Sequence, residues 1–257
     1  MAKKDISKLP TDSQTFRKIG LTRKEYKDLD VLIADIDRVL KKHKVRYWMD
    51  GGTMLGAVRH RGMIPWDDDV DIGVYAEDES KLHKALRELE PKYDIEWDSE
   101  SGDCRRVIVS VRSKSEFPFA EFFIYTIEKG RTRFRCKQDE KDWGKKCYHD
   151  IQDLFPLKKY QYGNKEMSGA YNAIPYFNRC YGRDWNDVAY RQQSHKEGFH
   201  YDEDRRVRLT KFDNVAGVHN EKVYNPKTRK WIKKNSAAHK RLIKDGILSA
   251  KSKKNLF

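Results

Sequence analysis

Residues 47–75 read YWMDGGTMLGAVRHRGMIPWDDDVDIGVY, and this stretch decides the fold. A glycine pair followed by a hydroxyl residue, Gly51-Gly52-Thr53, comes first, and a run of acids that alternates with apolar residues follows. Successive side chains of a strand point to opposite faces, so Asp69 and Asp71 are expected on one face while the apolar residues beside them enter the core. The pattern predicts a strand that presents two carboxylates together.

These carboxylates predict a cation site. Two of them about 7 Å apart along a strand repel each other unless a cation lies between them. Asp69 and Asp71, with Asp67 as a further candidate, offer the oxygen ligands that Mg²⁺ or Mn²⁺ prefers, and both ions bind phosphate. Gly51-Gly52 lets backbone N–H groups approach a phosphate, and Thr53 adds a hydroxyl or caps the next helix. The alternative is a solvated acidic loop beside a plain turn, but the acids are embedded among apolar residues.

The same stretch resembles the signature of the LicD and fukutin-related family of phospho-alcohol transferases, within the nucleotidyltransferase superfamily. The resemblance runs over nearly the whole of residues 47–75, including Arg59-His60 and the Ile64-Pro65-Trp66 turn. It implies an α/β (α+β) fold: a mixed sheet with flanking helices, a glycine turn that opens a helix, two acids on the next strand and a third acid on a later one. Arg59 is expected to neutralise phosphate. His60 is most simply explained as a polar residue of the fold, but its place inside the signature makes it a candidate to touch substrate.

A third carboxylate lies at Glu121, inside the aromatic and aliphatic run 119–125. A lone acid in such a strand is costly unless it is paired or bound to a metal. Family members usually carry Asp here, so Glu121 is a departure by one methylene. We expect Glu121 to be a metal ligand or the base that takes a proton from the acceptor hydroxyl. The alternative is a glutamate on an edge strand that faces water.

Arg106 lies near the start of a predicted strand, residues 105–111, at a position where relatives place an arginine. Arginine suits bidentate contact with phosphate, and an ordinary exposed arginine at a strand end is the equal alternative. The resemblance continues through Tyr181-Gly182, which reads as the C-terminus of a helix. It covers residues 45–188 in all.

The remaining patterns organise the chain around one domain. Apolar residues at three- and four-residue spacing predict an amphipathic helix over Thr22 to Lys44, and three leucines predict a second helix that ends before Pro91. The expected parts are an N-terminal extension (1–21), a nucleotidyltransferase-fold catalytic domain (22–192), a linker (193–222) and a small basic C-terminal appendage (223–257).

Most of the net charge of +14 lies in the appendage. Residues 223–257 hold eleven Lys or Arg and one acid, which leaves +4 for the preceding residues. Nucleic-acid binding by the catalytic domain is therefore not expected. The tail resembles a short NP-x-T-x-[RK]-x-I module of large DNA virus proteins, and Ser236 is expected to cap a helix through Leu242. Three interpretations of the tail are open, in order of preference: it binds a protein partner, it is a solvated basic tail, or it contacts nucleic acid.

The sequence also predicts the cellular location of the protein and the state of its cysteines. It contains no apolar run of membrane-spanning length and no N-terminal apolar segment, which predicts a cytoplasmic protein, virus-encoded and acting in the host cytoplasm if the tail resemblance holds. The four cysteines show no CxxC spacing, so reduced thiols are expected rather than a zinc site or disulfides.

Together, these features predict a metal-dependent transferase. It would move phosphocholine or a polyol phosphate such as ribitol phosphate from a CDP-activated alcohol to a sugar hydroxyl of a glycan or glycoprotein, with release of CMP. A nucleotidyltransferase that uses an NTP is one alternative. A non-catalytic binding protein that recruits a partner through its tail is the other.

Overall fold

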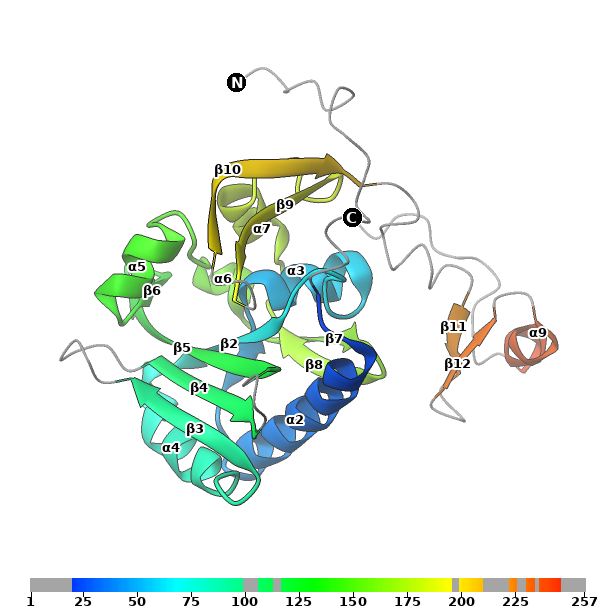
Figure 1. Cartoon of the computed structure of the whole chain (residues 1–257), viewed down its shortest axis with the longest axis horizontal. Coiled ribbons are helices and arrows are strands. Elements are labelled where there is room, and N and C mark those ends of the chain that lie inside the picture. Colours follow the sequence, from blue (N-terminus) through cyan, green and yellow to red (C-terminus); the bar gives the residue numbers. More distant parts are fainter. Residues whose placement is uncertain are drawn as a thin grey trace.

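The computed structural model describes residues 20–98, 106–112, 117–195, 199–209, 222–225, 230–233 and 236–245. A mixed sheet forms the centre of the fold, in the order β1-β2-β5-β4-β3, with β6 paired to β5 (Figure 1). Only β2 and β5 run parallel within this sheet; its other described pairs are antiparallel. The strands are β1 (Tyr47–Met49), β2 (Asp69–Tyr75), β3 (Tyr93–Asp98), β4 (Arg106–Val111), β5 (Phe119–Glu128) and β6 (Arg131–Phe134). The predicted mixed α/β architecture is confirmed.

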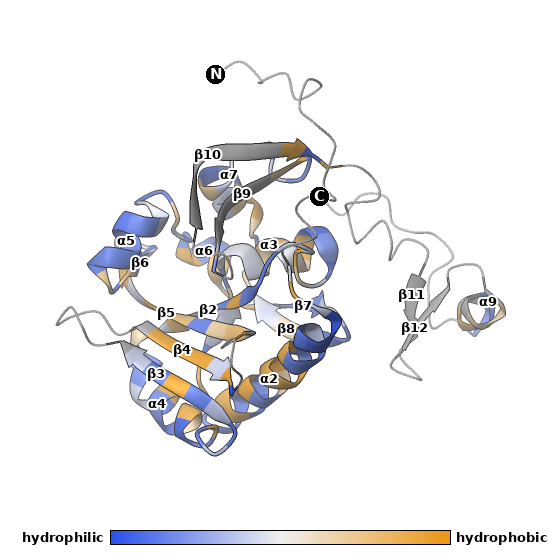
Figure 2. Cartoon of the chain, in the orientation of Figure 1, coloured by the Kyte–Doolittle hydropathy of each residue, from blue (hydrophilic) through white to orange (hydrophobic). Residues whose placement is uncertain are grey.

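Helices α2 (Arg23–Lys42) and α4 (Glu79–Arg87) pack together below the sheet in the view of Figure 1. Six apolar residues of α2, from Leu29 to Leu40, are buried, as their spacing predicts. A capping box fixes the start of α2, because Thr22 and Glu25 each bond the other's backbone N–H. Apolar residues lie along the central strands and in stripes on these helices (Figure 2), which places the core between the two layers.

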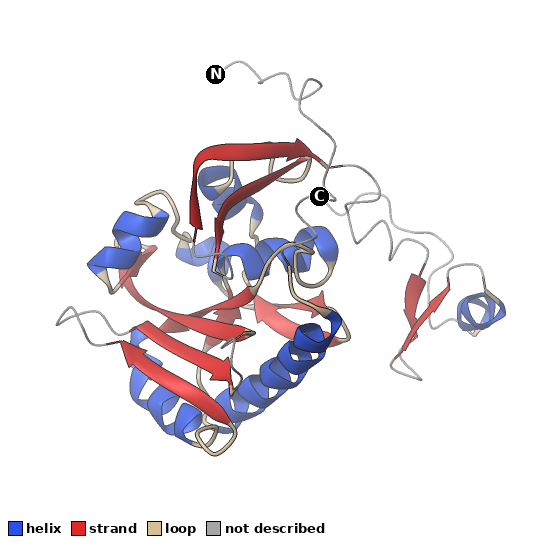
Figure 3. Cartoon of the chain, viewed as in Figure 1, coloured by secondary structure: helices blue, strands red, loops and turns tan. Residues whose placement is uncertain are grey.

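Helix α3 (Gly51–His60) lies on the other side of the sheet, between β1 and β2 in the chain (Figure 3). It packs against β2 and against β7 (Lys158–Tyr162). Helix α7 (Ile174–Cys180) has Tyr181 as its C-cap, followed by Gly182 at φ +90°, so the predicted helix end is confirmed. The remaining elements are η2 (Ala76–Asp78), α5 (Lys137–Trp143), α6 (Ile151–Leu154), β7 (Lys158–Tyr162), β8 (Lys165–Gly169) and α7 (Ile174–Cys180).

Two hairpins follow the central fold. Strand β9 (Val188–Ser194) pairs with β10 (Phe199–Arg208) and runs across the predicted boundary between the catalytic domain (22–192) and the linker (193–222). Strands β11 (Lys222–Asn225) and β12 (Lys230–Lys233) precede α9 (Ala237–Lys244), which lies where a short helix after Ser236 was predicted. Within the described part of the chain, no helix combines the length and the apolar character that crossing a membrane requires.

A disulfide joins Cys147, in the loop before α6, to Cys180, the last residue of α7, with Cα atoms 5.1 Å apart. The prediction of reduced thiols is wrong for this pair. The sequence did not indicate this contact, because the two cysteines are 33 positions apart in the chain and only the tertiary fold brings the loop to the end of α7.

Candidate active site

The acidic strand presents its carboxylates as predicted. Asp69 and Asp71 lie on one face of β2, while Val70 and Ile72 between and beyond them are fully buried. The parallel pairing of β2 with β5 sets Asp71 directly opposite Glu121. Residues that are register partners on neighbouring strands point to the same face of a sheet, so the three carboxylates meet.

The three carboxylates form a compact and buried cluster. One oxygen from each of Asp69, Asp71 and Glu121 lies within 4.8 Å of the others, and the residues are only 7 %, 5 % and 5 % exposed. Burial, and then the charges of the neighbouring carboxylates, raise the pKa values of Asp69 and Asp71 well above the usual range. A set of hard oxygen donors that repel one another fits a divalent cation such as Mg²⁺ or Mn²⁺.

The glycine turn holds one of these carboxylates directly. The backbone N–H of Gly52 donates to Asp71 Oδ2 at 2.8 Å, and the hydroxyl of Thr53 accepts from the backbone N–H of Asp71 at 2.7 Å. Gly51 has φ +45°, and a Cβ there would lie 2.5 Å from Asp71 Oδ2. The turn was predicted to bind phosphate; in the structure its Gly52 N–H and Thr53 hydroxyl bond Asp71 at the start of α3, where the helix dipole favours negative charge.

A pocket of about 150 Å³ opens beside the cluster. Asp67 lines it with Asp68, Asp69 and Asp71, and burial, followed by the charge of Asp68, raises the pKa of Asp67 to about 7. Its other lining residues are mainly aromatic, aliphatic or basic: Gly52, Leu55, Arg59, Ile64, Trp66, Trp143, Tyr181, Trp185 and His195. The lining of the pocket therefore combines acidic side chains with aromatic rings.

Arg59 lines this pocket but is largely committed to the fold. Its Nη1 donates to the carbonyl oxygens of Trp185 at 2.6 Å and Val188 at 3.4 Å, and its Nε donates to His60 Nε2 at 2.8 Å. Burial lowers the pKa of Arg59 to about 10, which still leaves it charged at neutral pH. Arg59 thus ties α3 to the segment that leads into β9.

His60 and Arg106 were also predicted to contact substrate. The structure buries His60 completely, packs its ring edge-on against Trp66 and places it outside the residues that line the pocket. Because His60 Nε2 accepts from Arg59, its visible role is to support that arginine. Arg106 begins β4 as the register partner of Asp98, and its side chain lies outside the described residues.

His195 was not found from the sequence. It directly follows β9, and its Nδ1 lies 2.9 Å from Asp68 Oδ1 and 3.9 Å from Asp69 Oδ2. Burial alone lowers the pKa of His195, but the hydrogen bond and charge of Asp68 outweigh it and raise the value. No local signal marks this histidine, because 127 residues separate it from Asp68.

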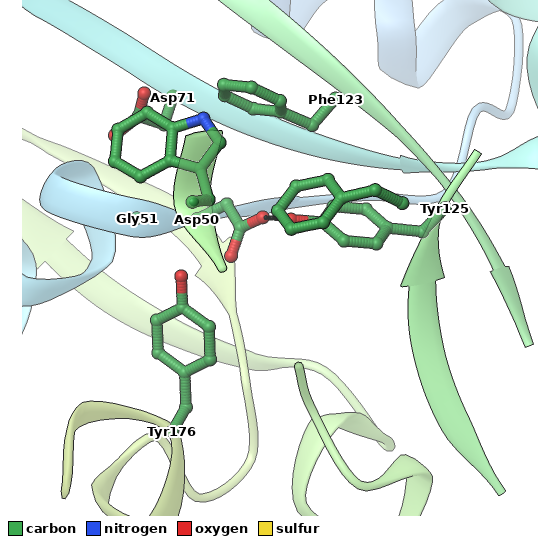
Figure 4. Close-up of a pocket in the computed structure, with 8 residues that line it drawn as sticks. Asp50, Gly51, Asp71, Phe123, Tyr125 and Tyr176 are labelled. Carbon is green, nitrogen blue, oxygen red and sulfur yellow. Dashed lines mark hydrogen bonds between the residues drawn. The ribbon is translucent and has the colours of Figure 1, made fainter. Parts of the chain in front are cut away.

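A second set of residues that the sequence did not identify lies next to the glycine turn (Figure 4). Asp50, Tyr125 and Tyr176 line a small pocket that shares Asp71 and Trp143 with the larger one. The Tyr125 hydroxyl donates to Asp50 Oδ2 at 2.5 Å. A polar network around Asp50 therefore adjoins the glycine turn.

Comparison with known proteins identifies the family of this chain. The LicD/FKTN/FKRP nucleotidyltransferase domain matches residues 44–171, which include the glycine turn and all three clustered carboxylates. An uncharacterized protein of Rickettsia prowazekii is 31 % identical over 174 residues, which are 67 % of this chain and 60 % of that protein. The lipopolysaccharide cholinephosphotransferase LicD of Haemophilus influenzae is 30 % identical over 118 residues, 41 % of this chain and 44 % of that enzyme.

Human ribitol 5-phosphate transferase FKRP is 60 % identical over 40 residues, 16 % of this chain and 8 % of that protein. Among solved structures, a lincosamide antibiotic adenylyltransferase aligns with a TM-score of 0.32 at 19 % identity, over 58 % of this chain and 80 % of that one. The chain spans less than two thirds of the length of each of these curated relatives. From residue 44 to 171 it carries the nucleotidyltransferase domain of the LicD/FKTN/FKRP family, and it belongs to that family.

Proposed function

We propose that the protein is a metal-dependent transferase that moves a phospho-alcohol from a CDP-activated donor to a sugar hydroxyl of a glycan or glycoprotein. The observation that carries the proposal is the meeting of Asp69, Asp71 and Glu121 within 4.8 Å at the start of α3, beside an open pocket. Relatives named for cholinephosphate and ribitol 5-phosphate transfer support the class of reaction. Phosphocholine and a polyol phosphate are therefore the two kinds of group to test.

Each part of the site has a role in this proposal. Asp69, Asp71 and Glu121 would hold Mg²⁺ or Mn²⁺, with Asp67 beside them in the pocket lining. When bound, such a cation would neutralise the diphosphate charge and polarise its oxygens. Arg59, which is charged and lines the pocket, would add a positive charge from the protein. The N-terminus of α3 faces the same region and also favours negative charge.

The transfer itself needs an oriented acceptor. The acceptor oxygen would bond to the distal phosphorus of the donor as the bond to the CMP oxygen breaks, and the hydroxyl proton would pass to a carboxylate of the site. Glu121, as base or ligand, and Asp67 are the candidates for that proton. The aromatic wall formed by Trp66, Tyr181 and Trp185 would exclude water from the reacting atoms.

A thermal-shift titration with CDP, CTP, CDP-choline and CDP-ribitol, each with and without Mg²⁺, tests the proposal. A ligand that binds the folded state raises its melting midpoint by mass action. Mg²⁺-dependent stabilisation by one CDP-alcohol beyond that of CDP is the expected result, and it would identify the donor. Stabilisation by CTP alone would favour nucleotidyl transfer from an NTP. No shift with any of the four would contradict both readings and favour a binding protein.

A further inference from the structure

Asp50, the residue before the glycine turn, is a buried carboxylate held by two side chains. It is 2 % exposed; the hydroxyl of Tyr125 donates to its Oδ2 at 2.5 Å, and His149 Nε2 lies 3.1 Å from its Oδ1. The His149 ring is itself 1 % exposed and stacks on Tyr176, with centroids 4.1 Å apart. In Figure 4 the hydroxyls of Tyr125 and Tyr176 both point toward Asp50. Strand β5, the loop before α6, and helix α7 thus converge on one carboxylate.

Hydrogen bonds connect Asp50 and the glycine turn to Asp71. The N–H of Asp50 donates to the carbonyl oxygen of Asp71 at 3.1 Å. Two residues later, the Gly52 N–H donates to the Asp71 carboxylate at 2.8 Å, and the Thr53 hydroxyl accepts from the Asp71 N–H at 2.7 Å. Residues 50–53 therefore hold the amide nitrogen, the carbonyl and the carboxylate of Asp71 at once. Asp50 makes the first of these contacts itself and directly precedes the turn that makes the other two.

Asp50 also acts through its charge. Its carboxylate lines the same small pocket as that of Asp71, so the two negative charges repel each other when no cation is bound. Such repulsion destabilises the metal-free fold, and asparagine would avoid it while keeping hydrogen bonds to both neighbours. A carboxylate at this position is therefore unfavourable for folding alone, but it favours a cation bound at Asp71.

We propose that Asp50 is a positioning residue for the cation site. Its carboxylate, held by Tyr125 and His149, fixes the glycine turn against Asp71 and adds negative charge behind it. The inference rests on the proposed function in one respect, namely that Asp69, Asp71 and Glu121 hold a divalent cation.

Asp50→Asn tests the proposal, with Mn²⁺ as the probe. The amide oxygen can still accept from Tyr125, and the amide N–H₂ can donate to His149 in its other tautomer. We expect the dissociation constant for Mn²⁺, measured by isothermal titration calorimetry, to rise about tenfold or more because a nearby negative charge is lost. The melting midpoint of the metal-free protein is expected not to fall. An unchanged dissociation constant overturns the proposal, whatever the midpoint does.

Two further variants keep the test decisive. Asp78→Asn is the matched control, since Asp78 is also a buried carboxylate but pairs with Arg46 and Lys81 away from the cluster. It is expected to lower the midpoint and leave Mn²⁺ binding unchanged. If Asp50→Asn does not fold, Tyr125→Phe decides, because it keeps the ring and removes one anchor of Asp50. Weaker Mn²⁺ binding in Tyr125→Phe supports the proposal, and unaltered binding contradicts it.

The same titration separates this inference from the proposed function. A wild-type protein that binds no Mn²⁺ contradicts the cation site of the proposed function. If the wild type and Asp50→Asn bind Mn²⁺ equally tightly, the result contradicts only the role of Asp50.

Discussion

Asp71 and Glu121 face each other across the parallel pair of β2 and β5, as direct register partners. Fifty residues of chain separate them, and the pairing brings their carboxylates, with that of Asp69, within 4.8 Å. A shift of the register by one residue would turn Glu121 to the opposite face of the sheet. The site therefore depends on strand pairing as much as on the acids themselves.

Asp71→Asn is expected to reduce transfer by about 10³-fold or more, because losing a cation ligand removes several kcal/mol of charge stabilisation. The fold should persist, since the asparagine oxygen can still accept from the Gly52 N–H. Product formation and the melting midpoint are the two measurements. Asp94→Asn, at an exposed carboxylate on β3, is the control and should leave both unchanged. A fully active Asp71→Asn protein would falsify the cation-site reading.

Glu121→Asp and Glu121→Gln together test the third carboxylate. Aspartate keeps the charge and shortens the reach by one methylene, so we expect measurable transfer to remain. Glutamine keeps the length and loses the charge, so Mn²⁺ binding and transfer should both drop, by about tenfold or more for binding. The measurements are calorimetric titration with Mn²⁺ and CMP release. The reverse order, with glutamine more active than aspartate, would show that the charge of Glu121 is not what matters.

Gly51→Ala is expected to destabilise the fold and to disturb the cluster. A non-glycine residue in left-handed backbone costs about 1–2 kcal/mol, and here the added Cβ would also meet Asp71 Oδ2 at 2.5 Å. Gly130→Ala is the matched control, because Gly130 has φ +74° with no atom within 4 Å of an added Cβ. Both variants should lose stability in urea denaturation, but only Gly51→Ala should weaken Mn²⁺ binding. Equal Mn²⁺ affinities would mean that the turn does not position Asp71.

Asp78→Asn should make stability less dependent on acid pH. Burial acts to raise the pKa of Asp78, but hydrogen bonds from Arg46 and Lys81 outweigh it and lower the value to about 2, against 3.8 without these contacts. A lowered folded-state pKa means that the carboxylate stabilises the protein above pH 3.8, and that this stability is lost as the pH falls through 2. The melting midpoint of the variant should lie below that of the wild type at pH 7 and meet it near pH 2. A constant gap across that range would contradict the assignment.

Much of the fold could be predicted because its signals are local. The alternation around Asp69 and Asp71, the apolar spacing of α2, and the turn chemistry of Gly51-Gly52 each depend on neighbours in the chain. The structure bears out the mixed sheet and the helix positions that these patterns predict. Arg59 and His60 also make contacts that no local pattern indicates, since Arg59 donates to backbone carbonyls and to His60.

Contacts between distant segments carried no local signal. His195 meets Asp68 across 127 residues, and His149 meets Asp50 across 99. Cys147 and Cys180 likewise pair only because the end of α7 packs beside the loop before α6. Such contacts depend on how whole elements pack, and a histidine or cysteine looks the same in a sequence whether or not that packing occurs.

The chain order alone therefore specified a strand with two carboxylates on one face, a glycine turn beside it and a family whose members transfer phospho-alcohols. Tertiary structure decided that Glu121 completes the cluster, that Asp71 is held through residues 50–53, and that His195 reaches the pocket. The physical reason is the distance along the chain between the residues that interact. Side-chain alternation and turn geometry follow from a few adjacent residues, whereas strand register and buried polar networks form only when burial brings remote segments together.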